Sequence, residues 1–175
     1  MIQKVVTALE IFITFLLQTT LFPSISVASV VPNLLLILTV SNGFMRGKKA
    51  GLFTGFFSGL MIDIFYSDLL GFYALVYMYI GFLNGMLFKV YYDDDVKVPM
   101  VLVAISDLVY GLAIYGFQFL LRGRTQIFYY FWHIIIPEMV YTTLMTLILY
   151  RIYYRINNLA AGNEKEGQRL PWLKK

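Results

Sequence analysis

The chain has 175 residues, 59% of them hydrophobic and only 14% charged, against about 25% charged residues in soluble domains, which predicts a single-domain membrane protein. It has no Cys and one His, which excludes disulfides, thiol chemistry and a Cys/His zinc site. The net charge is +4, but the Lys and Arg residues cluster between apolar runs, a pattern typical of loops beside a membrane and not of a nucleic-acid-binding face.

Six apolar runs are candidates for helices that cross a bilayer, since a span needs about 20 residues. The first contains Glu10 and is too long for the apolar region of a signal peptide, so a retained helix is favoured over that alternative. Pro32 begins the second run, Gly81 and Gly85 form a small-residue pair in the fourth, and Pro137 interrupts the sixth. We predict an all-α domain over residues 1–156, with spans at 5–22, 32–45, 50–66, 71–90, 99–121 and 128–150. For the polar cytoplasmic tail at 157–175, disorder is favoured over docking of residues 171–173 on a partner or the membrane surface.

The third run, GLFTGFFSGLMID, has glycines at positions 51, 55 and 59 and ends on Asp63. Residues four apart lie near one face of a helix, so Gly51, Gly55 and Gly59 predict a bare stripe that another helix can approach closely. That helix belongs to this chain, which is the favoured interpretation, or to another subunit. We expect the remaining helices to pack around this one, with Asp63 facing protein because a carboxylate is costly in lipid.

The basic residues predict how the chain is oriented in the membrane. Six spans place both termini on one side, and with the N-terminus inside, 12 of the 14 Lys and Arg residues are cytoplasmic. Only Arg122 and Arg124 are then outside, so the inside-positive rule predicts cytoplasmic termini. Three consecutive Asp residues, 93–95, lie in a cytoplasmic loop that is interpreted as solvated, with a contact to a cytoplasmic protein as the alternative.

Four acidic residues lie inside the predicted spans: Glu10, Asp63, Asp107 and Glu138. An acid in a span is by default a functional candidate, here for a proton or substrate path. The alternative is a hydrogen bond to a neighbouring helix that fixes packing. Packing or partner contact is favoured for all but Asp107, which lies near mid-depth and stays open. Asn33 begins the second helix on the same outer side as Asp63, so these two side chains can meet.

Four segments in the first half of the chain, taken together, resemble the MreD family of rod-shape-determining membrane proteins. They are PNLLLIL from residue 32, GFMRG from 43, GLFTGFFSGLMIDIF from 51, and LG with AL at 70–75, and the motif block covers about residues 32–85. The family's Pro-Asn or Pro-Asp pair corresponds to Pro32 and Asn33, and its Asp in the glycine helix to Asp63. The last three helices match in hydropathy and length.

The resemblance implies a protein of the bacterial cytoplasmic (inner) membrane that acts in the elongasome, the machinery of peptidoglycan synthesis during elongation. It implies MreC as a partner, with RodA, a class B penicillin-binding protein and MreB filaments beyond it. It also implies a six-helix fold similar to the substrate-binding subunits of energy-coupling-factor transporters. We hypothesise a non-catalytic scaffold that holds a partner's transmembrane helix at the glycine stripe and helps to determine rod shape.

The alternative function is that of a vitamin-binding subunit in such a transporter. It requires an outward-facing pocket lined with polar groups, for which the chain offers Asn33, Asp63, His133 and Glu138. An enzyme is the least favoured class, because the sequence has no Walker, GxSxG or HExxH motif and no paired nucleophile and base. No catalytic, cofactor-binding or metal-binding residue is therefore predicted.

Overall fold

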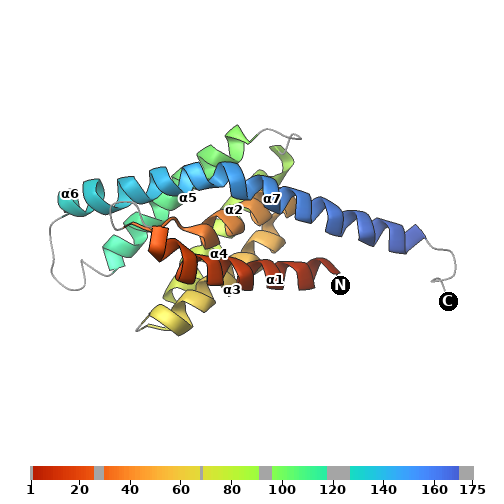
Figure 1. The fold of residues 1–175 in the computed structure, drawn as a ribbon, viewed down its shortest axis with the longest axis horizontal. Helices are drawn as coiled ribbons and strands as arrows, with labels where there is room; N and C mark the ends of the chain where they lie inside the picture. Colours follow the sequence, from red (N-terminus) through yellow and green to blue (C-terminus); the bar gives the residue numbers. More distant parts are fainter. Residues whose placement is uncertain (1, 26–29, 68, 91–95, 118–126, 170–175) are drawn as a thin grey trace.

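The computed structural model describes residues 2–25, 30–67, 69–90, 96–117 and 127–169. These residues form helices and short connections, which confirms the predicted all-α class for the described part of the chain (Figure 1). The predicted three-Asp loop, both outer arginines and the last six residues lie outside it. The α-helices are α1 (Ile2–Leu16), α2 (Leu34–Arg46), α3 (Lys48–Tyr66), α4 (Phe72–Met86), α5 (Lys97–Tyr115), α6 (Ile127–Tyr130) and α7 (Ile136–Arg169).

Short 3-10 and π-helical segments extend or join these helices. They are a π turn at Leu17–Leu21 and a 3-10 turn at Phe22–Ile25 after α1, a 3-10 turn at Leu87–Val90 after α4, and a π turn at Phe131–Ile135 between α6 and α7. Three helical stretches in the described residues are long and apolar enough to cross a membrane: Gln3–Ser24, Lys97–Tyr115 and Phe128–Ala161. Six separate spans stay a prediction, because α2 and α4 are shorter apolar helices and α3 is not among these three stretches.

The helix that the others surround is α2, which lies in the middle of the molecule (Figure 1). Every residue from Leu34 to Met45 is buried. The expected centre, α3, instead exposes several aromatic side chains, among them Phe53 and Phe57. The prediction that the molecule packs around α3 is therefore wrong. α2 has no charged residue before Arg46, and a helix that is apolar on nearly all sides is buried on all sides.

Two prolines are accommodated by π turns that lie just before them. Proline lacks an N–H, and its ring clashes with the carbonyl four residues earlier. The π turn at Leu17–Leu21 ends two residues before Pro23, and the one at Phe131–Ile135 ends two residues before Pro137. Wider turns of this kind are a known way for a helix to pass such a point. The expected interruption of the sixth span is thus a local widening within one continuous helix.

The last helix extends further than the sequence analysis expects. α7 continues to Arg169, through most of the segment predicted to be a disordered tail. Polar character alone does not end a helix, and residues 159–161 and 164–166, LAA and EKE, are strong helix formers. The first proline of the tail comes only at position 171. The disorder expected from residue 157 is therefore wrong as far as Arg169.

The central position of α2 predicts that a leucine buried in it contributes more to stability than an exposed leucine on another helix. Leu38 is fully buried in α2, whereas Leu83 on α4 is 55% exposed. We expect Leu38→Ala to lower the free energy of unfolding by about 2–5 kcal/mol through the cavity that it leaves. Leu83→Ala, the matched control, is expected to have little effect. Thermal unfolding of both variants in detergent checks this, and equal melting temperatures would contradict the central role of α2.

Candidate functional site

The glycine stripe of α3 lies directly against α4. A Cβ atom added to Gly59 would lie 2.5 Å from the Cα of Ala74, and Cβ atoms on Gly51 and Gly55 would approach carbonyl groups of α4 even more closely. Real Cβ atoms essentially never come within 3.0 Å of such neighbours. Gly81 on α4 makes the reciprocal close approach to Gly51. The stripe is filled by this chain's own α4, so the helix of a partner cannot occupy it as hypothesised.

The carboxylate of Asp63 caps the first turn of α4. Oδ1 accepts the N–H of Tyr73 at 3.0 Å and Oδ2 accepts the N–H of Ala74 at 2.8 Å. The first N–H groups of a helix have no partner inside it, and its positive N-terminal end favours a negative charge. Gly71, with a φ of +100°, forms the turn that leads into α4. Asp63 is fully buried and closes the α3–α4 pair.

Asn33 joins three helices at the start of α2. Its Oδ1 accepts the N–H of Leu36 at 3.1 Å, which caps α2, and the hydroxyl of Tyr77 from α4 at 2.6 Å. Its own N–H donates to Oγ1 of Thr142 on α7 at 3.1 Å. Pro32 is buried just before this cap. The side chains of Asn33 and Asp63, which the sequence allowed to meet, bind the starts of two different helices.

A row of polar contacts fixes α1 against α2. The guanidinium of Arg46 donates to Oγ1 of Thr7 at 2.5 Å, and the Asn42 amide donates to Oε2 of Glu10 at 3.4 Å. Further along, the amide oxygen of Gln18 accepts an N–H in the first turn of α2 at 2.9 Å. Glu10 is thus a packing contact between two helices. Thr7 and Glu10 are three positions apart on α1, which places them on one face, and Gln18 lies in the π turn that follows.

The two remaining acids belong to a buried cluster between α5 and α7. Asp107 is 2% exposed, and neither of its carboxyl oxygens has a hydrogen-bond partner among the described residues. Glu138 and Tyr110 lie near enough to interact with it electrostatically, and Thr142 lies beside it. A buried polar atom without a partner is rare in folded proteins. Asp107 therefore keeps a functional interpretation, and the packing role expected for its neighbour Glu138 stays a prediction.

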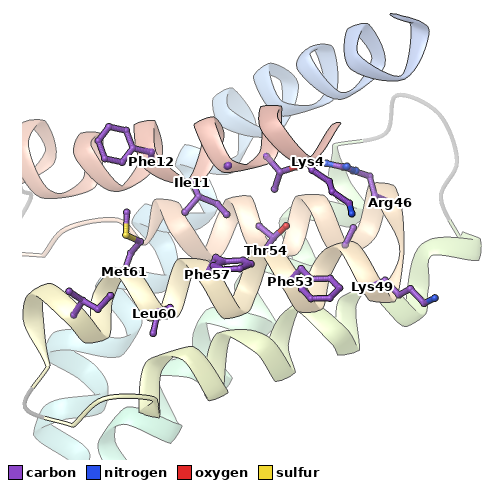
Figure 2. Close-up of a pocket in the computed structure, with 14 residues that line it drawn as sticks. Lys4, Ile11, Phe12, Arg46, Lys49, Phe53, Thr54, Phe57, Leu60 and Met61 are labelled. Carbon is purple, nitrogen blue, oxygen red and sulfur yellow. Dashed lines mark hydrogen bonds between the residues drawn. The ribbon is translucent and has the colours of Figure 1, made fainter. Parts of the chain in front are cut away.

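A groove with a volume of about 750 Å³ runs between α1 and α3 (Figure 2). Most of its lining is apolar, while Lys4, Arg46 and Lys49 gather at one end. This groove is not predicted from the sequence. The sequence pattern that could have indicated it is the aromatic pair Phe53 and Phe57. These two residues lie four positions apart, on a different side of α3 from the glycines.

Comparison with known proteins gives one match. The model of a family described as rod shape-determining protein MreD matches residues 1–156 of the chain. The match confirms the resemblance noted from the motif block and extends it over all the predicted spans. No curated protein and no solved structure matches the chain.

The fit between α3 and α4 predicts that Gly55 tolerates no larger residue. A Cβ there would lie 2.6 Å from the carbonyl carbon of Tyr77, so Gly55→Leu must push the two helices apart. We expect strong destabilisation. It should appear as aggregation in size-exclusion chromatography in detergent, or as a large drop in the melting temperature measured by thermal unfolding. The control is Phe56→Leu, at an exposed position next to it. A Gly55→Leu protein that melts like the wild type would contradict this packing.

The cap on α4 predicts that Asp63→Asn is destabilising, although the residue keeps its size. An amide has only one acceptor oxygen, so one of the two N–H groups loses its partner, and the favourable charge at the helix end is lost. We expect a loss of about 1–3 kcal/mol in the free energy of unfolding, measured by thermal or denaturant unfolding in detergent.

Ser67→Ala serves as the control for the Asp63 variant. It removes only the exposed turn contacts of the Ser67 hydroxyl, which accepts the N–H of Leu69 at 3.1 Å and donates to the carbonyl of Leu69 at 2.9 Å. Unfolding of Asp63→Asn indistinguishable from this control would show that the carboxylate does not support α4.

Proposed function

Because the chain belongs to the MreD family of rod shape-determining proteins, we propose that it is a non-catalytic scaffold of the bacterial cell-elongation machinery. The family makes it an integral membrane protein that acts in cell shape. In this proposal the protein binds MreC and helps to position peptidoglycan synthesis, with RodA, a class B penicillin-binding protein and MreB filaments in the same assembly. It lies in the inner membrane with both termini in the cytoplasm.

The family match over residues 1–156 is the observation that carries this proposal. The uses of the buried polar residues support it. Asp63 and Asn33 cap helices, and Glu10 contacts Asn42 between α1 and α2. A carboxylate or amide engaged in this way has few acceptor positions left for a substrate. The family is structural and not known as an enzyme, and these contacts suit that role.

The proposed partner contacts lie on the outward faces of the helices and not at the glycine stripe, which α4 fills. Outward apolar side chains are present on each of the longer helices, for example Phe57 on α3, Leu83 on α4, Ile105 on α5 and Leu144 on α7. Helices associate in lipid by van der Waals packing and interhelical hydrogen bonds. A single-span partner such as MreC can pack on such a face without displacing any helix of this chain.

The vitamin-binding alternative is less well supported by the geometry. It requires Asn33, Asp63, His133 and Glu138 to line one outward-facing pocket. Asp63 is occupied in the cap of α4, whereas Asn33 adjoins the cluster that contains Glu138 through its contacts with Tyr77 and Thr142. His133 is exposed, with its ring stacked on Tyr129 at a centroid distance of 4.2 Å. With Asp63 engaged in a helix cap and His133 exposed, only two of the four required residues adjoin one cluster, which favours the scaffold.

Affinity purification from bacterial membranes in mild detergent tests the scaffold proposal. We expect MreC to co-purify with the tagged protein, and we expect expression of the protein to restore rod shape in cells that lack their own copy. A photoreactive amino acid at position 57, 83, 105 or 144 is expected to cross-link to MreC from at least one face.

Two results would reject the scaffold. One is recovery of an ATPase-bearing transporter module or a bound vitamin in place of MreC. The other is normal expression and membrane insertion without any rescue of cell shape. The control for the cross-links is a photoreactive residue at position 38, which is enclosed within α2 and should give no cross-link to another protein.

A further inference from the structure

We propose that the groove between α1 and α3 binds an anionic phospholipid, with an acyl chain between the two helices and the phosphate at the basic end. The proposal goes beyond the scaffold role and does not depend on it. It rests on the length, the volume and the charge distribution of the groove (Figure 2).

The groove has the dimensions of a lipid chain. Along α3 its lining runs from Lys49 to Ile64, which corresponds to about 22 Å at 1.5 Å per residue. A chain that enters from one surface of a bilayer has about 15 Å to the midplane of a hydrocarbon core about 30 Å thick. The volume of 750 Å³ also falls within the ~300–1,000 Å³ usual for sites that bind small molecules.

The walls of the groove are apolar over most of this length. Two residues of α1 and four of α3 contribute large apolar side chains to this lining. They are Ile11, Phe12, Phe53, Phe57, Met61 and Ile64. Phe12, Phe53, Phe57 and Ile64 are exposed, so an acyl chain would cover apolar surface that this chain leaves open.

The basic end brings together cations from three helices. Lys4 comes from α1, Arg46 from the end of α2 and Lys49 from the start of α3, and Figure 2 shows all three at the same end. The Arg46 guanidinium is positioned by its hydrogen bonds to Thr7 at 2.5 Å and Gln3 at 3.2 Å. A guanidinium suits phosphate because it donates two parallel hydrogen bonds, and lysines add compact positive charge.

The basic end of the groove is predicted to lie at the cytoplasmic leaflet, which carries anionic lipid. The inside-positive rule predicts that Lys4, Arg46 and Lys49 are cytoplasmic. Basic pockets between transmembrane helices on that side are known to hold acidic headgroups. The headgroup would therefore sit at the surface while the chain follows the groove toward the midplane.

A transmembrane helix of a partner fits this groove less well. A helix about 10 Å across that crosses about 30 Å of hydrocarbon takes up on the order of 2,000 Å³, well above the volume of the groove. A helix also brings no obligatory negative charge to the three cations, whereas an anionic lipid always does. Size and charge together favour the lipid.

Native mass spectrometry of the full-length protein in detergent tests the site. The probes are palmitoyl-oleoyl phosphatidylglycerol and the phosphatidylcholine with the same chains. We expect the wild type to retain phosphatidylglycerol about tenfold better or more, because several cations near the membrane surface act together on one phosphate. Lys4→Ala combined with Lys49→Ala is expected to remove most of this preference.

Two further variants separate the site from general electrostatics and from misfolding. Arg151→Ala with Arg155→Ala removes the same charge from exposed positions on α7 and should leave the preference unchanged. Ala8→Trp is expected to fill the groove and weaken binding of both lipids. The melting temperature without added lipid should be unaltered in all of these variants.

Several outcomes would overturn the proposal. Equal retention of the two lipids by the wild type would reject it, as would an equal loss in the α7 double variant. A cross-link from position 57 to MreC would show that a partner's helix occupies the groove, which rejects the lipid but supports the scaffold. Cross-links to MreC from other faces only, together with selective phosphatidylglycerol binding, would support both proposals.

Discussion

The carboxylate of Asp63 bound to the first turn of α4 is the contact on which the arrangement of this molecule depends. Both oxygens accept backbone N–H groups, so the start of α4 is held at the end of α3. The glycines of α3 then let the two backbones approach along the rest of their length. In lipid, no hydrophobic force brings two helices together. The hydrogen bonds of Asp63 and the close packing at the glycines hold α3 and α4 together without a hydrophobic force.

The two sides of α3 have different roles that follow from its sequence. Gly51, Gly55 and Gly59 provide backbone contact with α4, while Phe53 and Phe57 face the groove toward α1. The two sets alternate along the same helix because each repeats every four residues. A single stretch of sequence thus serves both the internal packing and an open apolar surface, which explains why its composition looks unusual for either purpose alone.

Much of this fold can be predicted from the sequence, because long apolar runs and small-residue spacing act locally. The described helices overlap all six predicted spans, and the spacing of the α3 glycines correctly indicates a close approach. Which helix packs on the glycine stripe of α3 is not predictable in the same way, since any helix with small residues could approach it. The N–H groups that Asp63 binds are positioned by the conformation of the short turn between α3 and α4. Hydropathy does not predict that conformation.

The remaining differences have specific physical causes. α2 is central because it carries no charged residue before Arg46, and its amide side chain Asn42 donates to Glu10 inside the protein. Pro137 was expected to interrupt the sixth span, but a π turn relieves the clash before it, as another π turn does before Pro23. The groove was missed because it depends on the spacing between α1 and α3, which no single segment of the sequence encodes.

The length of α7 has a mechanical consequence. The predicted span ends at residue 150 and α7 continues to Arg169, so the helix extends by 19 residues, or about 28 Å, beyond that span. The excess lies at the polar C-terminal end, which extends beyond the other helices (Figure 1). A continuous helix of this length would hold whatever binds near its C-terminal end at a fixed distance from the membrane surface. Its reach would change in steps of about 1.5 Å for each residue inserted or deleted.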